Sequence, residues 1–142
     1  MRLSRRLVFA LLVTATPVAA QPAGDRGATL VALAAVLGQS HALRQACAGP
    51  SDQYWRARMM RLMDVEQPDE RLGSRLTEAF NTGFASRRVL FKTCTPAARR
   101  AEAAAAARGR ALTGGLSRTY GRSAKESQAT APDEMARGTR AP

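Results

Sequence analysis

Prolines and glycines divide the central part of this chain into four segments in which apolar residues recur at helical spacing. The divisions fall at Gly49-Pro50, at Pro68 and at Thr95-Pro96. Proline is tolerated in the first turn of a helix but breaks a helix interior, so each point predicts a helix boundary. No window alternates with a period of two for long enough to make a strand. The sequence therefore predicts an all-α fold, a small bundle of about four helices.

Each predicted helix carries its apolar residues along one face. The first runs from about Thr29 to Cys47, the second ends near Glu66, and the third reaches about Cys94. The fourth opens at Pro96, and the paired glycines at 114 and 115 predict a kink or a frayed end within it. Large apolar side chains at helical spacing are expected to anchor the core. These core anchors are Trp55, Met59, Leu62, Phe80 and Phe91.

The first 20 residues have the composition of a cleavable signal peptide. Arg2, Arg5 and Arg6 form a basic start, and an apolar stretch follows that is shorter than the roughly 20 residues of a membrane span. Small residues then lead to a predicted cleavage between Ala20 and Gln21. We therefore expect export to the periplasm without a transmembrane anchor, by the general route rather than the twin-arginine route.

The mature chain divides into a short linker, residues 21–28, a helical domain, residues 29–121, and a basic tail, residues 122–142. The tail contains Met135 as its only large apolar residue, so it is expected to be disordered. The 22 basic residues of the chain fall to 19 after cleavage, against 11 acidic ones, which leaves a formal charge of +8. Such a charge suits anionic lipid or envelope polymers, or simply a solvated surface. Export makes nucleic acid an unlikely partner.

Two cysteines, Cys47 and Cys94, are the strongest chemical feature of the mature chain. An even count in an exported protein, with both cysteines on apolar helix edges, predicts one disulfide. Two separate buried thiols are the alternative. A redox-active pair would have the Cys-x-x-Cys spacing at a helix N-terminus, and these cysteines are far apart in the sequence.

Catalytic and metal-binding signatures are sparse, so we expect no enzyme activity and no cofactor. His41 is the only histidine and is expected to be structural. Acidic residues gather near Pro68 at Asp64, Glu66, Asp69 and Glu70. A hydrolase or transferase could use such carboxylates, but helix capping explains them without a substrate.

The order of several residues resembles a family of short exported alphaproteobacterial proteins known only as a domain of unknown function. The resemblance covers residues 30–121. It rests on the two cysteines, Trp55, the segment Phe80-Asn81-Thr82-Gly83 and the late pair Tyr120-Gly121. Phe84 and the paired glycines at 114 and 115 depart from the family pattern. The resemblance implies a periplasmic location and an intact disulfide, but no reaction.

Asn81 and Gly83 both lower helix propensity inside the third predicted helix, so a compensating contact is expected there. Close helix packing at Gly83 is the structural explanation. The functional one is a polar pocket formed by His41, Asn81 and Arg87, which would bind an anionic ligand.

Two functions remain open at this point. The first is a non-catalytic module that binds another envelope protein. The second is an electrostatic binder of anionic envelope surfaces, in which the tail would act with a group of basic side chains on the last two helices. These are Arg87, Arg88, Lys92, Arg99 and Arg100.

Overall fold

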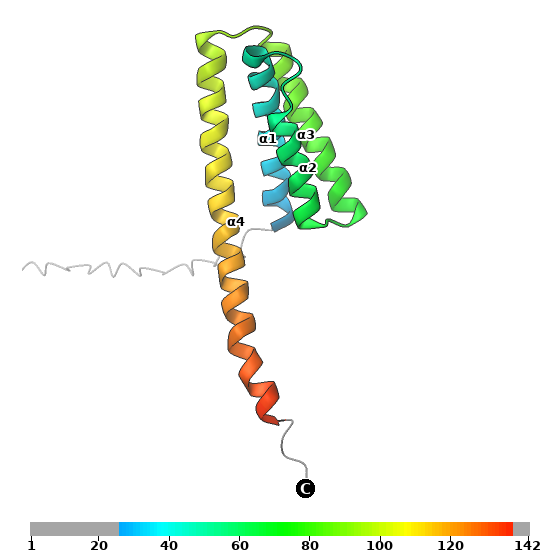
Figure 1. The fold of residues 1–142 in the computed structure, drawn as a ribbon, viewed down its shortest axis with the longest axis vertical. Helices are drawn as coiled ribbons and strands as arrows, with labels where there is room; N and C mark the ends of the chain where they lie inside the picture. The colour runs from blue at the N-terminus through cyan, green and yellow to red at the C-terminus, as the bar shows by residue number, and fades with distance from the viewer. Residues whose placement is uncertain (1–25, 138–142) are drawn as a thin grey trace, which may run out of the picture.

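Four helices form the part of the chain that the computed structural model describes, which is the backbone of residues 26–137 and the side chains of residues 26–128. They are α1 (Arg26–Ala48), α2 (Tyr54–Glu66), α3 (Glu70–Leu90) and α4 (Pro96–Arg137), and no strand occurs in this range. The helices alternate in direction, so that α1 and α3 run parallel (Figure 1). The all-α prediction is confirmed. Residues 1–25, which include the predicted signal peptide and its cleavage site, lie outside the described residues.

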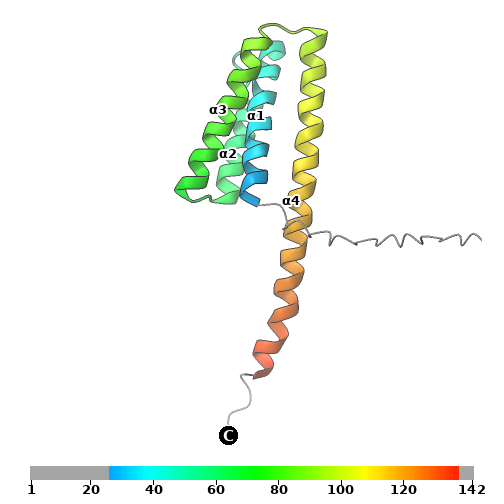
Figure 2. The same cartoon turned by 180° about the vertical axis from the view of Figure 1, so that it is seen from behind.

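Helix α1 is the centre of the arrangement, because it makes the main contacts with each of the other three helices. Helix α4 lies on the opposite side of α1 from α3, as Figures 1 and 2 show from the two sides. Ten residues of α1 are consequently buried, from Leu30 to Leu43. None of the described helices combines the length and the hydropathy that a membrane span requires.

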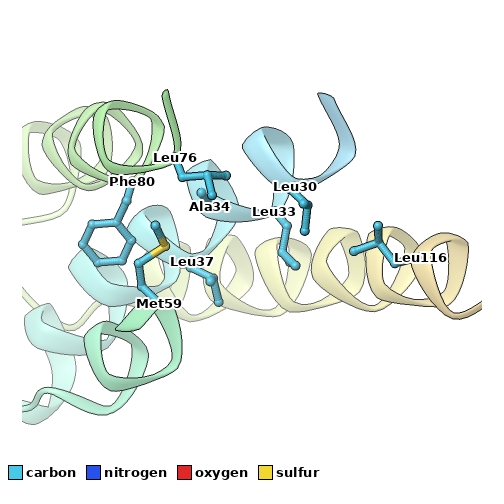
Figure 3. Close-up of a cluster of buried hydrophobic side chains, with 8 residues drawn as sticks. All are labelled: Leu30, Leu33, Ala34, Leu37, Met59, Leu76, Phe80 and Leu116. Carbon is cyan, nitrogen blue, oxygen red and sulfur yellow. The ribbon is translucent and has the colours of Figure 1, made fainter. Parts of the chain in front are cut away.

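One hydrophobic cluster draws side chains from all four helices (Figure 3). Two predicted anchors, Met59 and Phe80, are buried within it, while Trp55 and Leu62 are half-buried against it. A second cluster joins α1 to the upper part of α4, and Phe91 packs against that one. The five predicted anchors therefore contribute to the core to different degrees.

The contact between α1 and α3 is so close that two glycines are required. A Cβ atom at Gly38 would lie 2.0 Å from the carbonyl oxygen of Phe80, and one at Gly83 would lie 2.2 Å from that of Ala35. Real Cβ atoms do not approach a backbone oxygen to such distances, so the two helices meet backbone to backbone. This agrees with the structural explanation proposed for Gly83.

The disulfide between Cys47 and Cys94 is present, with a Cα–Cα distance of 4.4 Å. Its location differs from the expectation of two apolar helix edges, since both cysteines are exposed. Helix α3 ends at Leu90, and Cys94 lies in the short loop before α4. The chain must reverse direction between residues 91 and 95, so the helix cannot continue to Cys94.

Helix α4 is longer than expected. It passes without interruption through Gly114 and Gly115 and ends at Arg137, within the segment predicted as a disordered tail. Alanine, arginine, lysine and glutamine have high helix propensity, and they extend a helix that is already formed. Residues 121–128 are all exposed, in agreement with the expectation that this segment adds nothing to the core. Residues 138–142 lie outside the described part.

Candidate functional site

An apolar groove runs along α1 between α2 and α4. Its cavity volume is about 480 Å³. The floor is formed by α1 and the two walls by α2 and α4. The lining residues are Leu33, Val36, Leu37 and Ser40 of α1, Tyr54, Trp55, Arg58, Arg61, Leu62 and Val65 of α2, and Ala105, Ala106, Gly109, Arg110 and Thr113 of α4. Apolar side chains dominate this surface, and it remains open to solvent, because Val65 is 69% exposed and Tyr54 is 44% exposed.

The two walls of the groove differ in size. The α2 wall carries Tyr54 and Trp55, whose rings meet edge to face with centroids 5.0 Å apart. On the α4 wall, three of the five lining residues are small, namely Ala105, Ala106 and Gly109. The α2 wall is therefore bulky, whereas the α4 wall would allow another molecule to approach the helix backbone closely.

Arginines border the groove on both sides. Arg58 and Arg61 belong to the α2 wall and Arg110 to the α4 wall, and none of the described residues that line the groove is acidic. The Arg58 guanidinium lies over the Tyr54 ring, 4.2 Å from its centroid, and donates a hydrogen bond to the Tyr54 hydroxyl. These contacts hold the Arg58 guanidinium in place, although Arg58 is exposed, as Arg61 and Arg110 are.

A cluster of three polar side chains, the polar clasp of Arg26, Glu66 and Tyr120, joins three helices beyond the Val65 end of the groove. The Tyr120 hydroxyl donates to Glu66 Oε1 at 2.7 Å and accepts from Arg26 Nε at 2.9 Å, while Arg26 and Glu66 also form an ion pair. Burial, together with the hydrogen bond to Glu66, raises the pKa of Tyr120. The hydrogen bond to Tyr120 raises the pKa of Arg26. The clasp thus connects the ends of the two groove walls.

The three residues of the predicted polar pocket have different surroundings. His41 is 4% exposed, and its ring lies 5.8 Å from that of Phe80 and 5.2 Å from that of Phe84. Asn81 is exposed and borders another hollow, beside Pro68, Asp69 and Glu70. The Nε atom of Arg87 is buried without a hydrogen-bond partner among the described residues. His41 is thus enclosed by aromatic rings at the α1–α3 contact.

Burial lowers the pKa of His41, and the nearby positive charge of Arg56 lowers it further, while Asp52 opposes both effects. Burial would by itself raise the pKa of Asp52. Hydrogen bonds from the Tyr54 N–H and from Arg44 outweigh it, so the Asp52 pKa is lowered. These groups stabilise the neutral imidazole and the charged carboxylate.

Two members of the acidic cluster near Pro68 have structural partners. Glu66 belongs to the polar clasp, and Asp69 caps α3 by accepting a hydrogen bond from the Leu72 N–H at 2.7 Å. Asp64 and Glu70 are exposed. Within the described residues, no group of histidine, cysteine and acidic side chains is arranged to hold a metal ion.

The five basic residues named for surface binding lie near the disulfide end of the bundle. Four of them are exposed and Arg87 is half-buried. Arg88 and Lys92 border a hollow beside Phe84 and Phe91. The structure adds a second basic group on the lower part of α4, where Arg118, Arg122 and Lys125 border a hollow together with Thr29 of α1.

The groove was not anticipated from the sequence. Tyr54, Arg58, Arg61 and Val65 recur at helical spacing on α2, and this second face, adjacent to the predicted core face, was the available signal. On α4 the signal is weaker, because alanine and glycine are small and carry no apolar pattern of their own.

Comparison with known proteins gives one match. The model of the family described as "Protein of unknown function (DUF2385)" matches residues 27–120. The match includes both walls of the groove and two of the three residues of the polar clasp, Glu66 and Tyr120. No curated protein and no solved structure matches the chain.

Proposed function

The chain belongs to the DUF2385 family of unknown function, and we propose that it is an exported, non-catalytic module that binds another protein of the cell envelope through the groove between α2 and α4. The observation that carries this proposal is the groove itself. It exposes Tyr54 and Val65 of α2 beside a floor of buried apolar side chains of α1, and a second protein would cover this surface. The arginines that border it would select that protein.

Export is supported by two independent features. The first 20 residues have the charge and apolar pattern of a signal peptide, and the disulfide is of the kind that persists in oxidising compartments. Mass spectrometry of the protein recovered from intact cells should give Gln21 as the first residue. A mature chain that still begins with Met1 would contradict export by cleavage.

A non-catalytic role is supported by the positions of the groups that could perform chemistry. His41 packs between aromatic rings, Glu66 is hydrogen-bonded in the polar clasp, and Asp69 caps a helix. None of these three side chains lines the groove.

Two valines of similar exposure provide a matched test. Val65 lies in the groove and is 69% exposed, whereas Val89 lies on α3 outside the groove and is 72% exposed. A photoreactive amino acid placed at residue 65 in living cells should give a defined protein adduct, and the same group at residue 89 should not. Equal labelling from both positions, or none from residue 65, would contradict the proposal.

A second candidate function is supported by the lower part of α4. Arg118, Arg122 and Lys125 fall at i, i+4 and i+7 and so share one helix face, and they are exposed. Such a stripe is suited to anionic lipid headgroups. Replacing all three with glutamine should abolish retention on vesicles that contain phosphatidylglycerol, and retention of the unaltered chain should fall as salt is raised. Retention that does not change with salt would exclude this function.

A further inference from the structure

The shape and charge of the groove also identify the kind of partner. Resting on the proposed function, we infer that the groove receives an amphipathic α-helix of the partner protein, with acidic residues on both sides of its apolar stripe.

The length of the groove fits a helix of about three turns. The lining residues of α2 extend from Tyr54 to Val65, and those of α4 from Ala105 to Thr113. At 1.5 Å of rise per residue, the α2 wall is about 17 Å long, which an occupant of about 11 or 12 residues would cover. The floor is a third helix, so the occupant would have helical neighbours on three sides.

The unequal walls favour a helix in a defined orientation. Ala105, Ala106 and Gly109 permit close approach on the α4 side, where the occupant can place leucine-sized side chains. Tyr54 and Trp55 fill the α2 side, where it needs small residues. A single acyl chain does not use such a difference. Small-molecule sites also enclose most of their ligand, whereas this groove leaves Val65 largely exposed.

The charge of the occupant follows from the border of the groove. Arg58, Arg61 and Arg110 lie on both sides, and the part of the chain that the structure describes contributes no acidic residue to the lining. Acidic residues on either side of the apolar stripe would face these arginines, and a basic helix would be repelled.

The same argument excludes this chain's own segments as occupants. Residues 1–25 contain three arginines and Asp25 as their one acid, and residues 138–142 contain Arg140 and no acid. A second copy would bring a formal charge of +11, or +8 after cleavage, against a basic border. Charge therefore favours a helix of a different protein as the occupant.

The full mature chain and three synthetic peptides test the inference. The peptides are helical, lack tryptophan and tyrosine, and comprise one with glutamates flanking a leucine stripe, one with lysines in their place, and a scrambled form of the first. Trp55 is the only tryptophan and forms part of the groove wall, so its fluorescence reports occupancy directly. We expect the glutamate peptide to bind at least about tenfold more tightly than the lysine peptide and the scrambled one not to bind.

Charge reversal supplies the matched control. The double variant R61E/R110E should bind the lysine peptide in preference to the glutamate peptide. The double variant R71E/R75E has the same net charge but alters exposed arginines outside the groove, and it should behave as the unaltered chain.

Three results would overturn the inference. The first is equal binding of the glutamate and lysine peptides, and the second is no binding of either. The third is saturable binding of lysophosphatidic acid in the groove without peptide binding. The crosslinking at residue 65 separates this result from the proposed function. An adduct at residue 65 combined with failure of the peptides would leave a protein partner of another shape, whereas loss of the adduct would remove the groove function itself.

Discussion

The two sides of α1 are built in opposite ways. Toward α3 the helices touch backbone to backbone at Gly38 and Gly83, with no space for a single added carbon. Toward α2 and α4 the same helix forms the floor of an open groove of about 480 Å³. Since one helix supplies both surfaces, the difference comes from its neighbours. The α1–α3 contact provides rigidity, and the groove leaves apolar surface free for a partner.

The disulfide is the largest single contribution expected to the stability of this arrangement. It closes a sequence separation of 47 residues and ties the end of α1 to the loop that leads into α4. Replacing both Cys47 and Cys94 with serine should lower the free energy of unfolding by about 4 kcal/mol, because the unfolded chain gains freedom. Urea denaturation measures this loss. Hydrogen exchange should then show the upper turns of α4 opening before those of α1 and α3. Identical stability of the two forms would contradict a structural role for the disulfide.

A methyl group on each side of α1 compares the two surfaces directly. Gly38→Ala places a Cβ against the Phe80 carbonyl and should cost about 3 kcal/mol, since α1 and α3 must move apart. Gly109→Ala places a Cβ 3.6 Å from the Val36 side chain, an ordinary contact, and should stabilise α4 by about 0.5–1 kcal/mol. Thermal unfolding of both variants distinguishes these outcomes. Equal destabilisation would show that the groove side is as tightly packed as the α3 side.

The apolar periodicity predicted much of the contact between α1 and α3 but little of the groove between α2 and α4. Phe80 of α3 is buried as expected, and the close contact at Gly83 was expected from its cost within a helix. Periodicity shows which face of a helix is apolar, but not how many other helices pack against that face. Ala98 and Ala105 are completely covered by α1, although alanine-rich sequence predicts only helix propensity.

The candidate site was missed for the same reason. A groove is a space between elements, and its existence depends on α4 lying beside α1 rather than across α3. The sequence of each helix alone does not specify that placement. The disulfide pairing could be predicted, but the exposure of the two cysteines could not, because the end of α3 depends on the reversal into α4.

The polar clasp tests whether the walls of the groove are held together at one end. Tyr120→Phe removes the hydroxyl that bonds to Glu66 and Arg26 but keeps the ring. The expected loss is about 0.5–1 kcal/mol, the usual net value of a hydrogen bond near the surface. Hydrogen exchange should show the lower turns of α4 opening more readily, while the α1–α3 contact stays protected. Equal changes at both surfaces would show that the clasp does not act on the groove alone.

Acidity should act on the α1–α3 side and not on the groove, because the charged residues that line the groove in the described part of the chain are all arginine. Burial against Phe80 and Phe84 lowers the pKa of His41 below its ordinary value of 6.5. The unfolded chain therefore takes up a proton at higher pH than the folded chain. Stability is fully present above pH 6.5 and falls as the pH drops from there toward the lower folded pKa. Urea unfolding should show that the free energy of unfolding falls more between pH 7.5 and pH 5 for the unaltered chain than for His41→Gln. This comparison holds even if the two proteins differ in stability at pH 7.5. His41 is the only histidine in the sequence. If the free energy of unfolding of His41→Gln falls with acidity as steeply as that of the unaltered chain, other groups cause the pH dependence. The burial of the neutral imidazole would then have no consequence for stability.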